Sequence, residues 1–161
     1  MSQEPTPVDI KAVTEAVKGG QSLAEHFGLS PATGRALYTA AAGHYEAGRY
    51  AEAVDCLIKV TALDARMPDA WALLGNSLMR DGKFAEALEA WSLELHLRPS
   101  FASAHLVTRT SLALKDPASA AIGLIAMLKH MKTAEHGDAF VELGRAFQQL
   151  TSGGGSPAPG A

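Results

Sequence analysis

The sequence predicts an all-α protein built from about three tandem helix-turn-helix units. Two short phrases, GRYAEAV and GKFAEAL, are nearly identical and begin at positions 48 and 82. Apolar residues recur at helical spacing around both phrases. The two phrases are 34 residues apart. A repeat of about this length is typical of stacked helix pairs in which each pair covers the apolar face of the next. The 161 residues, 47% of them hydrophobic, are enough for one such stack.

The second unit, residues 67–100, matches the tetratricopeptide repeat most fully. That repeat calls for Trp, Leu-Gly, a later Ala, an aromatic residue and a closing Pro. Small residues allow the paired helices to approach closely, large aromatic residues fill the space beside them, and the proline stops the second helix. The residues that fit this pattern are Trp71, Leu74, Gly75, Gly82, Ala87, Trp91 and Pro99.

The other two units follow the pattern less closely. The first, residues 33–66, has Leu37 for the tryptophan and Ala65 for the proline, and it keeps Gly48, Tyr50, Ala53 and Leu57. The third, residues 101–133, aligns through Leu112, Asp116-Pro117, Ala121 and Ile125, with Ala121 placed one full period after Ala87. Three such units are expected to form a curved, right-handed superhelical stack.

The two ends of the chain differ from the repeats. Residues 8–32 contain a short helix with Ile10, Val13 and Val17 on one stripe, and residues 134–150 have the apolar spacing of a capping helix. Residues 1–7 and the Gly, Ser and Pro-rich residues 151–161 are expected to be disordered.

Composition narrows the classes of partner. Fourteen basic and seventeen acidic residues give a net charge of −3 without a basic run, which argues against nucleic acid. Cys56 is the single cysteine, and neither a secretory signal nor an apolar run of membrane-spanning length is found. We therefore expect a cytoplasmic protein that does not insert into a membrane.

No catalytic, cofactor or metal site is predicted. The six histidines include no pair at the spacing of three or four that places two ligands on one helical face. His44 has no carboxylate partner that the sequence identifies, and Cys56 is expected inside a helix with no activating base. Single glycines at the repeat corners do not form a phosphate loop. The sequence favours a binding protein over an enzyme.

The first helix of each unit is expected to line a concave binding groove. Spacing places a mixture of apolar, aromatic and polar residues there, and the groove does not have the converging cations that would hold an acidic carboxyl terminus. An extended apolar segment of a client protein fits better. The candidates are Arg35, Tyr38, Ala42, Tyr45 and Glu46; Asp69, Ala72, Leu73, Asn76, Met79 and Arg80; and Leu106, Thr110, Ala113 and Leu114.

A series of motifs in order resembles the class II chaperones of bacterial type III secretion, the SycD/LcrH type. The motifs are Gly19-Gly20, Leu37-Tyr38, residues 45–50 (YEAGRY) and Leu63-Asp64. The resemblance implies a cytoplasmic chaperone that holds hydrophobic translocator proteins by an extended segment in the concave groove and keeps them soluble and competent for export.

The resemblance also implies roles for individual residues. Tyr38, Tyr45, Tyr50 and Leu63 match client-binding positions of that family, whereas Ala42 stands where an aromatic residue is usual. Self-association through the amino-terminal helix is common in the family and would use Ile10, Val13 and Val17; the alternative is that this short stripe folds back on the repeats.

Two other functions remain open from the sequence. A general tetratricopeptide scaffold, for example in pilus or envelope assembly, shares the fold but protects no client. An enzyme is the third reading, and a pocket with His44 beside a buried carboxylate would support it.

Overall fold

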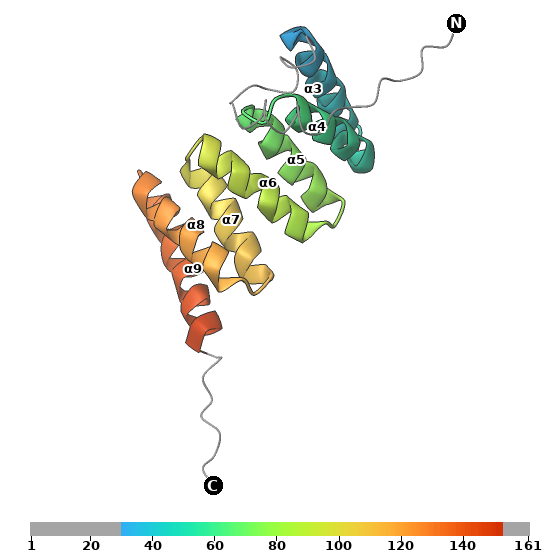
Figure 1. Ribbon diagram of the computed structural model, residues 1–161. Helices are drawn as coiled ribbons and strands as arrows, with labels where there is room; N and C mark the ends of the chain where they lie inside the picture. The colour runs from blue at the N-terminus through green and yellow to red at the C-terminus, as the bar shows by residue number, and fades with distance from the viewer. Residues whose placement is uncertain (1–29, 153–161) are drawn as a thin grey trace, which may run out of the picture. The chain divides into compact units, whose positions relative to one another are not determined.

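The computed structural model describes residues 30–152, which form seven α-helices and no β-strand (Figure 1). They belong to two compact units that divide after Met67. The first contains α3 (Pro31–Glu46) and α4 (Tyr50–Leu63). The second contains α5 (Pro68–Arg80), α6 (Phe84–Leu97), α7 (Phe101–Ala113), α8 (Pro117–His130) and α9 (Ala134–Ser152).

The predicted all-α architecture of helix pairs is confirmed. Helices α3 and α4 pack together, as do α5 and α6, and α7 and α8, while α9 packs on both α7 and α8. Most of the predicted amino-terminal segment 8–32, with Ile10, Val13 and Val17, lies outside the described residues. The superhelical curvature of the whole stack stays a prediction.

The turn inside each helix pair is made in the same way. Gly48 and Gly82 have positive φ angles of 73° and 80°, a conformation that costs glycine little. The next residue then donates its amide hydrogen back to the helix, from Arg49 N to His44 O at 2.9 Å and from Lys83 N to Leu78 O at 2.9 Å. These bonds satisfy carbonyl groups that the helix end leaves unpaired.

The third pair makes the same turn without glycine. Lys115 has a φ of 59°, and Asp116 N donates to Ser111 O at 2.8 Å. Asp116 then caps α8 by accepting hydrogen bonds at Oδ1 from the amides of Ala118 and Ser119, both at 3.1 Å. The side chain of Asp116 therefore fixes the start of α8.

The third unit reaches its corner one position earlier than a constant period predicts. Lys115 adopts the backbone conformation of Gly82, whereas the constant period would place Asp116 at that point of the turn. The fully buried alanine that follows Ala53 and Ala87 is accordingly Ala120, and Ala121 is half-buried. The alignment of Ala121 with Ala87 was wrong because the connection before α7, residues 98–100, is one residue shorter than the connection before α5, residues 64–67, and this shifts the whole third pair.

The two helix pairs of the second compact unit, α5–α6 and α7–α8, each approach closely at a glycine. In α5 and α6, Gly75 lies against the indole of Trp91, which is 1% exposed. In α7 and α8, Gly123 lies against Thr108, whose hydroxyl donates to Ala104 O at 2.8 Å. The core of this unit is therefore centred on these two contacts.

Candidate functional site

The exposed side of α5 carries three of the predicted groove residues. Ala70, Leu74 and Leu78 are buried and face the rest of the fold, while Leu73, Asn76 and Met79 are half-buried. Because successive residues of a helix are rotated by about 100°, Asn76 lies opposite the buried stripe, with Leu73 and Met79 on its two sides. These three side chains are therefore presented away from the seam between α5 and α6.

Helix α7 continues this side in a register one residue earlier than the constant period, because it begins at Phe101, 33 residues after the start of α5 at Pro68. Leu106 corresponds to Leu73 and is half-buried, and Arg109 corresponds to Asn76 and is exposed. We call the surface formed by Leu73, Asn76, Met79, Leu106 and Arg109 the groove face. Thr110, a groove candidate from the sequence, is buried and corresponds to the buried Ser77 of α5.

A cavity of about 520 Å³ opens at one end of the groove face. Its walls are mainly apolar, and Thr110 contributes a buried hydroxyl oxygen that has no hydrogen-bond partner among the described residues. Arg109 is the charged group in the lining. The cavity therefore suits an apolar side chain with a polar group beside it; it is lined by Met79, Phe84, Arg109, Thr110, Ala113 and Leu114.

Helix α9 packs on α7 beside His105. The rings of Phe101 and His136 stack with centroids 3.8 Å apart, and Phe101 also stacks on His105. Burial lowers the pKa of His105 below its usual value, and the charge of Arg109 lowers it further while Glu142 acts in the opposite direction. His105 is thus favoured in its neutral form, and Arg109 carries the positive charge of the groove face.

The first unit contains the remaining groove candidates. Tyr38, Ala42, Tyr45, Tyr50 and Leu63 are all half-buried. The rings of Tyr45 and Tyr50 meet edge to face with centroids 5.5 Å apart, so these two residues join α3 to α4. This contact gives Tyr45 and Tyr50 a packing role, and their role in client binding stays a prediction.

The groups considered for catalysis have ordinary structural surroundings. Arg49 Nε donates to His44 Nδ1 at 3.0 Å, which pairs His44 with a cation and not with a carboxylate. Cys56 is half-buried in α4. Residues 30–152 hold no group of three or more potential metal ligands. Over the same residues, no helix has the length and apolar character to span a bilayer.

One groove residue, Arg109, was missed by sequence reasoning. It was overlooked because the constant period places Thr110, not Arg109, beside Asn76. The turn at Asp116-Pro117 contained the necessary clue. When helix starts are aligned, Pro117 takes the place of Phe84, one position earlier than the constant period predicts.

No protein-family model matches the chain, and no curated protein matches its sequence. Solved structures do match its fold. A type III secretion complex from Aeromonas hydrophila aligns with a TM-score of 0.68 at 20% identity, over 89% of this chain and 97% of that one.

Two further structures carry bound peptides. The Yersinia enterocolitica type III secretion chaperone SycD, in complex with a peptide of the translocator YopD, aligns with a TM-score of 0.60 at 18% identity, over 78% of this chain and 98% of that one. The first tetratricopeptide domain of Spaghetti (RPAP3), bound to an HSP90 peptide, gives a TM-score of 0.61 at 20% identity over 73% and 94%. The chain therefore has the tetratricopeptide fold that type III secretion chaperones and other peptide-binding proteins share.

Proposed function

We propose that the protein is a cytoplasmic chaperone of a bacterial type III secretion system, with a hydrophobic translocator protein as its client. It binds an extended segment of this client on the groove face and keeps the client soluble and competent for export. The observation that carries the proposal is the mainly apolar cavity that Met79 of α5, Phe84 of α6 and the last turn of α7 line at one end of the groove face.

The groove face has the chemistry to hold an extended apolar segment. Leu73, Met79 and Leu106 keep part of their apolar surface open to a ligand. Asn76 and Arg109 can bond backbone carbonyl groups of a client, since an extended peptide leaves those groups unpaired. The buried hydroxyl of Thr110 offers one more polar contact at the cavity wall.

The comparisons support the same kind of ligand. A structure of similar fold, SycD, is a complex with a translocator peptide. The motif series that ends at Leu63-Asp64 resembles the same group of chaperones. Tyr38, Ala42, Tyr45, Tyr50 and Leu63 are accordingly proposed to contact the client as well.

The strength of binding follows from the number of apolar anchors. Three aliphatic client side chains would contribute about 5 to 9 kcal/mol, at roughly 1.5 to 3 kcal/mol each. Ordering a flexible segment consumes much of this free energy, so we expect affinities of about micromolar strength. Such a complex is stable enough to protect a client and weak enough to release it for export.

The test begins with mass spectrometry of proteins that co-purify with the chain from its native cell. A client with long apolar segments that is soluble only when co-expressed is the expected result. Leu73→Glu and Leu106→Glu should each weaken client binding by at least tenfold, because they place a charge on the apolar face. Ile58→Glu is the matched control, since Ile58 is 53% exposed on α4. Unchanged client binding by both groove variants, with helical spectra intact, would refute the proposal.

A general scaffold is the second candidate, and one observation favours it. Arg109 and Asn76 occupy equivalent positions in successive units, with Arg80 nearby on α5. A structure of similar fold holds an acidic peptide of HSP90. Tight binding of a peptide ending in Glu-Glu-Val-Asp, lost in Arg109→Ala, together with a partner that is soluble alone, would favour the scaffold.

A further inference from the structure

The outer face of α8 exposes large apolar side chains. Ile122 is 63% exposed and Ile125 is 57% exposed, and Leu128 is also exposed one turn further on. On α6, Leu93 and Leu97 are exposed as well. Ile122 and Ile125 line one cavity together, and a monomeric soluble protein rarely leaves a large apolar area uncovered. The groove face does not use these residues, because it is formed by α5 and α7.

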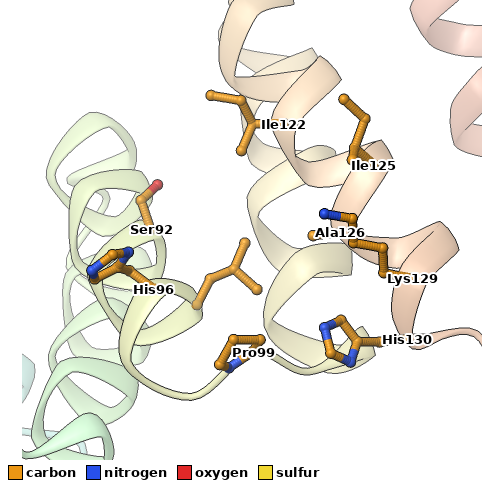
Figure 2. A pocket seen from close by; sticks show the side chains of 9 residues that line it. Ser92, His96, Pro99, Ile122, Ile125, Ala126, Lys129 and His130 are labelled. Atoms are coloured by element: carbon orange, nitrogen blue, oxygen red, sulfur yellow. The ribbon is translucent and has the colours of Figure 1, made fainter.

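Helices α6 and α8 border an outer groove made of two cavities. One is about 450 Å³ and is shown in Figure 2, where Ser92 and His96 lie on one side and Ile122, Ala126 and His130 on the other. The second is about 550 Å³ and lies toward the amino-terminal ends of both helices. Ser92 lines both cavities, so the two are neighbours along one channel.

The two ends of this outer groove have opposite charge. The amino-terminal cavity is lined by Glu89 and Asp116 and by no basic residue. The carboxyl-terminal cavity is lined by Lys129, His96 and His130 and by no acidic residue. Hydrogen bonds from Ser119 lower the pKa of Asp116, so its carboxylate stays charged at neutral pH. A helix that fits the groove therefore needs basic groups at one end, acidic groups at the other and apolar residues between them.

Helix α8 itself has this pattern. Asp116 stands at its start, Ile122 and Ile125 lie near its middle, and Lys129 and His130 lie in its last turn. We propose that the outer groove binds α8 of a second copy of this chain, antiparallel to the α8 that lines the groove. A two-fold axis near Ile122 and Ile125 makes the contact self-complementary, as a closed dimer requires.

This dimer leaves the client site open. The contact is centred on Ile122 and Ile125 of α8, which do not line the client cavity, and the two sites share one lining residue, Leu114. The proposal is therefore independent of the function proposed above, and it differs from the predicted association through Ile10, Val13 and Val17. Opposed α8 helices also place the positive end of each helix dipole beside the negative end of the other.

Sedimentation equilibrium of the full chain between about 5 and 200 µM tests the proposal. An interface of two helices per copy is at the low end of the usual size range, so we expect dimers with a dissociation constant of about tens of micromolar. Ile125→Asp should weaken the dimer at least tenfold. Ile58→Asp is the matched control, an exposed isoleucine on α4 that should leave the dimer unchanged.

A charge reversal tests the antiparallel orientation. Lys129→Glu and Glu89→Lys should each weaken the dimer several-fold, because each brings like charges together across the two-fold axis. The double variant should regain most of the loss. Val13→Asp should have no effect on the mass. A chain that stays monomeric at every concentration overturns the proposal, as does a dimer that Val13→Asp abolishes and Ile125→Asp leaves intact.

Discussion

The second and third helix pairs solve the same packing problem with opposite arrangements. In α5 and α6 the glycine is on the first helix, where Gly75 receives the indole of Trp91 from the second. In α7 and α8 the glycine is on the second helix, where Gly123 receives Thr108 from the first. The comparison teaches that a repeat requires one small residue at the crossing and does not require it on a particular helix.

The two pairs also differ at their corners. Gly82 makes one turn with a φ of 80°, and Lys115 makes the other with a φ of 59°. Helix α6 begins without a side-chain cap, whereas α8 begins with the cap from Asp116. The third pair therefore has a less favourable turn residue followed by a better helix start, and these two effects oppose each other in its stability.

The largest effect is expected from a methyl group added at either crossing. A Cβ atom at position 75 would lie 2.5 Å from Trp91 Nε1, and one at position 123 would lie 3.0 Å from the backbone N of Thr108. Gly→Ala normally gains about 1 kcal/mol inside a helix. Overpacking costs about 1 to 3 kcal/mol, and it is greater against backbone. Urea unfolding should show a net loss for both variants and the larger loss for Gly123→Ala.

Second-site changes separate the two crossings. Trp91→Leu should reduce the cost of Gly75→Ala, because the first helix pair already combines Ala41 with Leu57 at the equivalent positions. Thr108→Ala removes the nearest atom, Oγ1, and should restore Gly123→Ala only in part, since the backbone N and Cα of residue 108 remain 3.0 and 3.1 Å away. Full recovery in the second case would contradict the view that the third pair is limited by backbone contact.

Removing the cap of α8 should have an intermediate effect. Asp116→Ala leaves two amide hydrogens without acceptors and should lower the free energy of unfolding by about 1 kcal/mol. Because hydrogen bonds lower the pKa of Asp116 in the folded protein below its unfolded value, its contribution is complete above the unfolded value and disappears as the pH falls through the folded one. Asp116→Asn, which caps without titrating, should not show this loss on acidification.

The smallest effect is expected at the corners. Lys115→Gly should raise the free energy of unfolding by about 0.5 kcal/mol, because glycine accepts a positive φ at less cost than lysine. Gly82→Lys should lower it by a similar amount for the same reason. Thermal melting of both variants tests these two predictions. A loss of stability in Lys115→Gly would show that the lysine side chain has a compensating contact.

The sequence predicted the helix pairs well because most of their constraints are local. The repeated phrase places Gly48 and Gly82 at matching corners, and Gly75 was predicted to lie in a close helix contact, which it does. The constant period gave the wrong register for the third pair, because the connection before α7 is one residue shorter and the corner that follows has no glycine to mark the shift. Ala120 and Arg109 were missed for that reason. The groove residues of the first unit and the amino-terminal stripe stay predictions.

Helix α9 differs from the helices before it because none of its residues is buried. It is attached to α7 through the stacked rings of Phe101 and His136 and otherwise by half-buried side chains. In a stack where each element is stabilised mainly by its neighbours, such an end is the first to open. Its amide hydrogens should exchange before those of α5 to α8, and each opening briefly uncovers the face of α7 that continues to His105. The last helix of the repeat stack thus opens and closes reversibly, and the fraction of molecules in which it is open depends on the local free energy of α9.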